Sequence, residues 1–240
     1  MSLTGIMDNY GLVSDAKALT SWKQAVIDTN VVWANLLGIE PSTACTTVKP
    51  SGTVSQLVDS ASGVHTRFSP RYGRRVRCDM SDPLAKFMQE KGFPCEVDAY
   101  NPKVLVFTFP IESPKDSLFR DDLDAIEQVE VWERLNEYWC EHKVSCTIYY
   151  KDSEFLELGA YVYKNFDTMS GISFLPHTDH IYKQAPYEAV TYHEYRAMVA
   201  AMPKDVDWEE FSSYEQEDNT VGSQALACSG GVCEVVDLTN

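Results

Sequence analysis

The chain has 240 residues, 44% hydrophobic and 12% aromatic, which is ordinary for a globular protein with one large domain or two small ones. Its formal net charge of −16 argues against a nucleic-acid partner, because phosphates repel an acidic surface. No apolar run reaches the roughly 18 residues that a membrane span needs, and no signal peptide is visible, so we expect no membrane association. Seven cysteines without an export signal predict a reducing compartment, the cytoplasm.

The first element expected in chain order is a long amphipathic helix over 15–37, which Ser14 can cap and Gly38 ends. A short β-branched strand follows at 46–48. It leads through a Pro-Ser-Gly turn into a helix that ends near Gly63. These residues therefore predict a strand–turn–helix unit with small side chains in the turn.

Helices and strands continue to alternate after this unit. Consecutive and alternate apolar β-formers predict a strand at 103–110, and apolar residues at three- and four-residue spacing predict a second long helix at 121–142. The remaining expected elements are helices at 82–91, 156–165 and 188–202, a strand at 145–150, and a strand or extended segment at 171–176.

This alternation predicts an α/β architecture with mainly parallel strands. The character of the sequence changes at Pro203, after which it is acidic, then rich in glycine and serine, with little apolar periodicity. Such a segment cannot bury enough apolar surface to hold itself on a core. We expect a compact body over 1–203 and a flexible acidic tail over 204–240.

The turn "KPSGTVS", residues 49–55, is the first candidate site. Free backbone N–H groups at the start of a helix, together with the helix dipole, bind phosphate. Gly52 lets a ligand approach the backbone, and the neighbouring serine and threonine hydroxyls can donate hydrogen bonds. The stretch lacks the G-x-x-x-x-G-K pattern of a Walker A loop, and an ordinary capped turn is the alternative.

A basic stretch, "RFSPRYGRRVR", interrupts the acidic sequence and carries five arginines, at positions 67, 71, 74, 75 and 77. One interpretation is a solvated strand or loop that balances acidic neighbours. The other is contact with phosphate, because the forked guanidinium matches phosphate oxygens. The pattern alone leaves both open.

Five histidines give no convincing metal set. His177 and His180, with Asp179 between them, have ligand spacing, but two imidazoles on a loop are usually a surface feature, so we predict no metal site. His65 lies between a glycine and the arginines, and it can line the same site as the turn.

Five cysteines have no evident catalytic context. Cys140, on a helix, and Cys146, on a strand, are expected to be buried small hydrophobes. Cys45, Cys78 and Cys95 have no partner by spacing.

The last two cysteines, Cys228 and Cys233, stand in "ACSGGVCE" near the C-terminus. A zinc site needs two more ligands, which this segment does not supply, and a structural disulfide is uncommon in the cytoplasm. Two interpretations remain. The pair can be a redox dithiol on a mobile arm that exchanges with a distant disulfide, or it can be a functionless tail.

Several motifs occur in order along almost the whole chain: "SLTGIMDN" at 2–9, "CTTVKPSGTVSQLVDSASGVHTRFSPRYGRRVR" at 45–77, "WCEH" at 139–142, "GISFLP" at 171–176, "HIYKQAPYE" at 180–188 and "ACSGGVCE" at 227–234. Together they resemble the C-terminal portion of an adenosylcobalamin-dependent (class II) ribonucleotide reductase. The turn and the spacing of the last two cysteines resemble the ribonucleoside-triphosphate branch.

The resemblance implies a ten-stranded α/β barrel, of which this chain supplies the later part. It implies that the substrate phosphates bind at Ser51, Gly52, Thr53, Val54 and Ser55. It also implies that Cys228 and Cys233 reduce the disulfide that each turnover leaves in the barrel, and are then reduced by a thioredoxin-like carrier. The cofactor is adenosylcobalamin and the substrate a ribonucleotide.

The resemblance also implies that important parts lie outside this chain. The radical-bearing cysteine, its glutamate, both cysteines of the active-site disulfide, the allosteric region and much of the cobalamin site match no segment here. We therefore expect a cloned piece, a truncated reading frame or one half of a split enzyme, inactive without the missing N-terminal part. The alternative is a non-catalytic nucleotide- or phosphate-binding module derived from the same fold.

Overall fold

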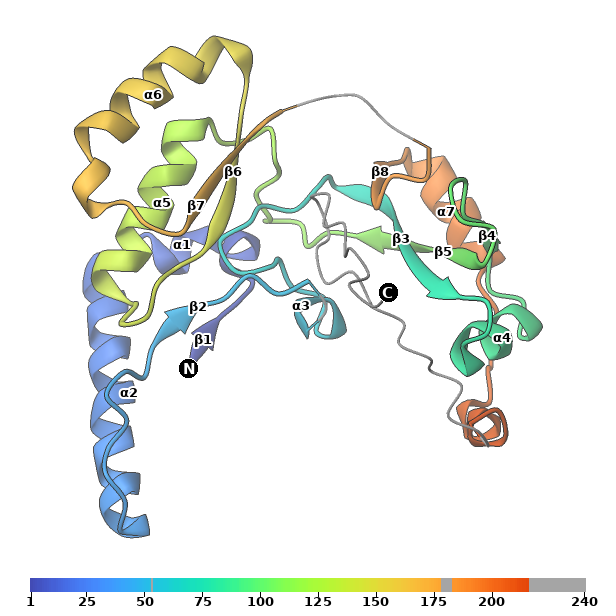
Figure 1. Ribbon diagram of the computed structural model, residues 1–240, viewed down its shortest axis with the longest axis horizontal. Helices are drawn as coiled ribbons and strands as arrows, with labels where there is room; N and C mark the ends of the chain where they lie inside the picture. The colour runs from blue at the N-terminus through green and yellow to red at the C-terminus, as the bar shows by residue number, and fades with distance from the viewer. Residues whose placement is uncertain (53, 178–182, 216–240) are drawn as a thin grey trace, which may run out of the picture. The chain divides into compact units, whose positions relative to one another are not determined.

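The computed structural model describes residues 1–52, 54–177 and 183–215, which form two compact units. The first unit contains Met1–Arg67 and residues 114–177, and the second contains Phe68–Ser113 and residues 183–215. Figure 1 shows the elements of each unit. None of the helices in these described ranges is long and apolar enough to cross a membrane.

The first unit holds most of the predicted helices. Its two-stranded parallel sheets are β1 (Ser2–Leu3) with β2 (Thr47–Val48), and β6 (Cys146–Tyr150) with β7 (Ile172–Pro176). Its helices are α1 (Tyr10–Val13), α2 (Ala16–Leu37), α3 (Val54–Leu57), α5 (Ala125–Tyr138) and α6 (Phe155–Lys164). Short 3₁₀ turns occupy Ile6–Asp8, Asp152–Glu154 and Phe166–Thr168.

The apolar stripe predicted on the second long helix forms the centre of this unit. Val129, Trp132 and Leu135 of α5 are at most 1% exposed. The indole N–H of Trp132 donates to the carbonyl oxygen of Val144 at 3.2 Å, and that of Trp139 donates to Thr47 at 2.9 Å. Buried indoles need such partners, so these bonds fix α5 against β2 and the approach to β6.

Helix α2 runs as predicted to Gly38, whose positive φ of 69° suits a glycine at a helix C-terminus. Its N-terminal cap differs by one residue from the prediction. Asp15, rather than Ser14, accepts the backbone N–H of Lys17, at 2.8 Å. Ser14 instead ends α1, where its hydroxyl donates to the carbonyl oxygen of Gly11.

The second unit is a four-stranded sheet in the order β4-β5-β3-β8, with every neighbouring pair antiparallel. The prediction of mainly parallel strands is therefore wrong for this unit. The sheet contains β3 (Arg71–Asp79), β4 (Cys95–Val97), β5 (Val104–Glu112) and β8 (Tyr187–Ala189), and its helices are α4 (Pro83–Glu90) and α7 (Tyr192–Ala201).

The start of the expected tail also needs a correction. Residues Trp208–Ser213 form a 3₁₀ helix, and Trp208, Phe211 and Tyr214 place their rings within 5.5 Å of the Phe87 ring centroid. Phe87 is fully buried. The aromatic residues of this segment had no helical or strand period, so their packing on α4 was not visible in the sequence.

Candidate functional site

The turn at 49–55 lies between a strand and a helix, as predicted. It connects β2 to the short helix α3, which ends at Leu57 instead of continuing towards Gly63. Thr53 lies outside the described residues, and Val54 is the first residue of α3 and 65% exposed. The predicted strand–turn–helix unit is therefore present, with a shorter helix.

Two amides of the turn are bound within the protein. The N–H of Ser51 donates to the hydroxyl oxygen of Ser62 at 2.7 Å, and the N–H of Ser55 donates to that of Ser51 at 2.9 Å. The hydroxyl of Ser55 donates to the carbonyl oxygen of Ser51 at 2.7 Å, and Ser55 is 1% exposed. These bonds hold the turn in one conformation.

A second segment, which contains Ser62 and Gly63, packs directly against the turn. Gly63 has a positive φ of 54°, and a Cβ at this position would lie 2.8 Å from the carbonyl oxygen of Lys49. Such contacts are closer than side chains tolerate, so only glycine allows this approach. The segment that contains Ser62 and Gly63 therefore holds the turn in place by close backbone packing and a hydrogen bond.

His65 joins this support to β6. Its Nδ1 lies 3.0 Å from the carbonyl oxygen of Ser62, and its Nε2 lies 3.1 Å from the backbone nitrogen of Thr147. The N–H of Thr147 must donate, so Nε2 accepts and Nδ1 carries the proton that is donated to Ser62. Burial lowers the pKa of His65, more than the bond to Ser62 raises it, and this favours the neutral ring.

A pocket of about 400 Å³ lies beside the turn, within the size range of small-ligand sites. The starts of β6 and β7 form much of its wall. Gly171 immediately precedes β7 and has a φ of 75°, and a Cβ there would lie 2.5 Å from the carbonyl oxygen of Val144. The lining residues are Pro50, His65, Lys143, Ser145, Cys146, Thr147, Gly171, Ile172 and Ser173. Hydroxyls and an ammonium group suit a polar or anionic ligand.

A buried ion cluster fixes the other end of the supporting segment. Arg67 is 3% exposed and donates to the carboxylate of Asp8 through two bonds of 2.7 and 2.9 Å. It also donates to the carboxylate of Asp59 at 3.0 Å and to its backbone carbonyl oxygen at 2.6 Å. Burial alone would raise the pKa of Asp8, but bonds from Arg67, Ala61 and Ser117 outweigh it and lower that pKa. Arg67 is thus a structural clamp.

Three other arginines of the basic stretch also bind carboxylates. Arg71 binds Glu112 at 2.7 Å, Arg77 binds Asp98 at 2.7 Å, and Arg75 binds Glu188. These partners support the first interpretation of this stretch, a strand that balances acidic neighbours, and β3 is that strand. These three guanidinium groups are therefore paired with carboxylates of neighbouring segments.

The remaining candidates divide into those the structure describes and those it does not. Cys140 and Cys146 are buried as predicted, and burial raises their pKa values to about 11 and about 12. Cys228, Cys233 and His180 lie outside the described residues. No group of three or more potential metal ligands occurs among the residues that are described.

Sequence reasoning missed the pocket wall from β6 and β7. The only signals were a lysine and hydroxyl residues before and within one strand, and a glycine before the other. These residues are far from the turn in sequence, and their approach depends on His65, which lies 82 residues from Thr147.

The fold was compared with solved structures. The chain matches a "crystal structure of B-12 dependent (class II) ribonucleotide reductase" with a TM-score of 0.72 and 27% identity, over 84% of this chain and 29% of that one. No family model matches the sequence. The fold is thus similar to that of a portion of a class II ribonucleotide reductase. The described residues form sheets of two, four and two strands, so a complete ten-stranded barrel is not confirmed.

Curated relatives give a more particular identification. The adenosylcobalamin-dependent ribonucleoside-triphosphate reductase of Lactobacillus acidophilus is 31% identical over 219 residues, which cover 88% of this chain and 29% of the relative. A probable enzyme of this name from Dictyostelium discoideum is 31% identical over 212 residues, 85% of this chain and 27% of the relative. The chain is homologous to the C-terminal portion of these proteins, so the resemblance is confirmed. It spans about 29% of their length.

Proposed function

We propose that the chain is the C-terminal part of an adenosylcobalamin-dependent ribonucleotide reductase and reduces ribonucleoside triphosphates together with the complementary part of the enzyme. The observation that supports this most strongly is a match over 88% of the chain to a reductase of that name, with a fold match over 84%. In this reaction the ribose 2′-hydroxyl leaves as water and hydrogen replaces it, while two thiols supply two electrons and become a disulfide.

The turn at 49–55 is proposed as the substrate-phosphate site, with Ser51, Gly52, Thr53, Val54 and Ser55 as the binding residues. The geometry that supports this is a turn held rigid by Ser62, beside a polar pocket. A turn that is already held in one conformation costs little ordering free energy when an anion binds. The ammonium group of Lys143, in the pocket wall, would add a positive charge near the phosphates.

Cys228 and Cys233 are proposed as the redox shuttle. One thiolate attacks the barrel disulfide and releases the first barrel thiol, leaving a mixed disulfide. The second cysteine then attacks this bond and releases the second barrel thiol, so the barrel pair is reduced and the shuttle pair is oxidised. A thioredoxin-like dithiol reverses the oxidation by the same two exchanges.

The described residues do not by themselves fit adenosylcobalamin. The pocket of about 400 Å³ is far too small for a corrin with its nucleotide tail, and no cluster of potential metal ligands occurs in the described ranges. The complementary part of the enzyme must therefore supply most of that site.

The rival function is a nucleotide- or phosphate-binding module without catalysis. The pocket beside the turn favours this second function, because all of its lining residues belong to the first unit and binding there needs no other part. The two functions differ in a direct way: a module binds nucleotide but never reduces it in any combination.

The test is a reductase assay with adenosylcobalamin, a ribonucleoside triphosphate and dithiothreitol. The chain alone should give no deoxyribonucleotide, because the radical-bearing cysteine is absent from it. Addition of the complementary part of a class II reductase should restore product formation. Activity of the chain alone would show that it is not a dependent part, and nucleotide binding without product in every mixture would favour the module.

A further inference from the structure

Helix α2 has two faces, of which only one packs on the first unit. The inner face carries Leu19, which is fully buried, and Ala34, which is 4% exposed. The return segment after Gly38 runs back along this helix, where the side-chain amide of Asn30 donates to the carbonyl oxygen of Ser42 at 3.4 Å. The inner face repeats at helical spacing through Leu19, Lys23, Ile27, Asn30 and Ala34.

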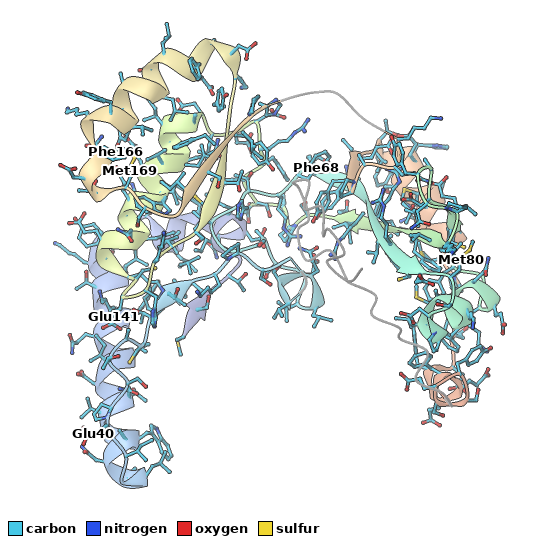
Figure 2. All side chains as sticks on the ribbon, viewed as in Figure 1. Glu40, Phe68, Met80, Glu141, Phe166 and Met169 are labelled. Carbon is cyan, nitrogen blue, oxygen red and sulfur yellow. The ribbon has the colours of Figure 1, made fainter. Side chains whose placement is uncertain are left out.

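The last two turns of the helix carry large apolar residues that are exposed outside this packed stripe. We call this group the α2 outer face, and it consists of Val32, Trp33, Leu36 and Leu37. Trp33 is 58% exposed and Leu36 is 70% exposed. Figure 2 marks the distal end of this helix at Glu40, with the side chains of the last turns around it. A surface helix normally carries polar residues outside its packed stripe, and large apolar residues elsewhere on a helix are normally buried.

The apolar residues of the outer face are contiguous. Val32, Leu36 and Trp33 are neighbours at three- and four-residue spacing, and Ile39, just after the helix, is 61% exposed. Single exposed apolar residues are common, but contiguous groups mark interaction surfaces. Burial of apolar surface is favourable roughly in proportion to the area removed from water, so this face can contribute substantially to an interface.

The strand layer of the same unit is incomplete in a corresponding way. Among the described residues, β1 pairs only with β2, and β6 pairs only with β7. Two-stranded sheets are marginal alone, and parallel strands normally have helices over both faces. Because the curated relatives are more than three times as long as the matched portion, the same missing part can supply further strands and helices.

Charge argues against a second copy of this chain as the partner. Each copy carries a formal net charge of −16, so self-association brings two strongly acidic molecules together. An apolar helix from a different polypeptide, in a partner with less negative charge, avoids this repulsion.

We infer that the α2 outer face is the docking surface for the complementary part of the reductase, which covers it with an apolar helix. This inference rests on the proposed function, since the partner is the remainder of the proposed enzyme. It adds to that function the residues that hold the two parts together, centred on Trp33 and Leu36.

The test measures binding without nucleotide or cobalamin. The probe is the Lactobacillus acidophilus relative truncated before its matching C-terminal portion, titrated with this chain by calorimetry and followed by light scattering. We expect a one-to-one complex, which Trp33→Asp with Leu36→Asp weakens about tenfold or more, because central aromatic residues dominate interfaces. The matched control is Tyr100→Asp, at a residue that is 73% exposed in the second unit, and it should bind normally.

Each outcome decides the inference. Equal binding by the wild type and the α2 variant overturns it, and so does a wild type that stays monomeric without binding the probe. Self-association that the α2 substitutions abolish, without binding of the probe, makes a second copy the occupant and also overturns it. A complex that depends on Trp33 and Leu36 but never reduces ribonucleotide leaves the docking surface intact and removes the proposed function instead. Far-UV circular dichroism checks that the variants are folded.

Discussion

The Nε2 atom of His65 accepts a hydrogen bond from the backbone N–H of Thr147 at 3.1 Å, so one imidazole connects the segment that packs against the turn at 49–55 to β6. Its other nitrogen binds the carbonyl oxygen of Ser62, and the hydroxyl of Ser62 holds the amide of Ser51. Three hydrogen bonds thus lead from the turn to the far wall of the pocket. The connection needs a neutral imidazole, because a protonated ring has no acceptor for the Thr147 amide.

The first prediction concerns the pH dependence of stability. Burial lowers the pKa of His65 in the folded state, so below its ordinary value of 6.5 the unfolded chain binds more protons than the folded one. Stability is therefore complete above that value and is lost as the pH falls towards the lowered pKa. The urea midpoint should decrease between about pH 7.5 and about pH 5.5 in the wild type, and less in His65→Gln.

Other groups near His65 do not produce this difference. Lys143 and Cys146 line the same pocket, and burial raises the pKa of the Cys146 thiol to about 12, so it stays neutral throughout. The pKa values of the Asp8 and Glu141 carboxyl groups are lowered from their ordinary acidic values, so these groups titrate below the pH interval of this experiment. If both proteins lose stability equally over this interval, His65 is not the group responsible.

The second prediction concerns the buried ion cluster. Arg67→Met leaves the carboxylate of Asp8, whose side chain is 14% exposed, without its main partner. Removal of one member of a buried pair costs about 3–5 kcal/mol, and Met adds no compensating charge. The free energy of unfolding from urea titrations should fall by about this amount. Asp8→Asn in the same chain should recover part of the loss, because the only carboxylate that then lacks Arg67 is that of Asp59, which is 67% exposed.

The control for this prediction is Arg71→Met in the second unit. Arg71 binds Glu112 as well, but this pair is 33% and 43% exposed. Exposed pairs contribute about 0–1 kcal/mol, so the control should change stability little. Equal losses in the two variants would show that burial of the Arg67 pair is not what matters.

Local features of the fold followed from the sequence where the determinants were local. The stripe on α5 and the glycine at the end of α2 were sufficient for those helices, since they depend on periodicity and φ alone. The turn between β2 and α3 was also visible, because its small residues are adjacent in the chain. The confirmed resemblance added the reductase family, which no physical pattern specified.

Features that depend on distant partners did not follow. The sequence left two interpretations of the arginine stretch open, because the carboxylates of Glu112, Glu188 and Asp98 that pair with Arg71, Arg75 and Arg77 come from other segments. The antiparallel pairing of β3 with β5 joins residues that are far apart in sequence. The pocket wall depended on His65 and Thr147, and neither residue carries a local signal of the other.

The third prediction concerns the two buried thiols. Cys140 and Cys146 have pKa values raised by burial to about 11 and about 12, and only thiolates react quickly with alkylating reagents. Iodoacetamide at about pH 8 should therefore leave both unlabelled in the folded chain and label both in guanidinium, as read by mass spectrometry of the peptides. Cys45, which is partly exposed, is the internal control and should react in the folded chain. Rapid labelling of Cys146 without denaturant would contradict its burial.

The last prediction concerns Cys228 and Cys233, in the complex of this chain with the complementary part of the enzyme. Four residues with two glycines separate the cysteines, so their sulfurs can approach the disulfide distance of about 2 Å. Replacement of both by Ser should leave one turnover intact, because the barrel thiols start reduced. Repeated turnover with thioredoxin should stop, since a protein carrier is too large to enter the barrel. Dithiothreitol, which is small enough to reach the barrel disulfide directly, should restore turnover in part. The measurement is product per enzyme with each reductant, with Cys45→Ser as the matched control, and normal turnover of the double variant with thioredoxin would show that the pair is not the shuttle.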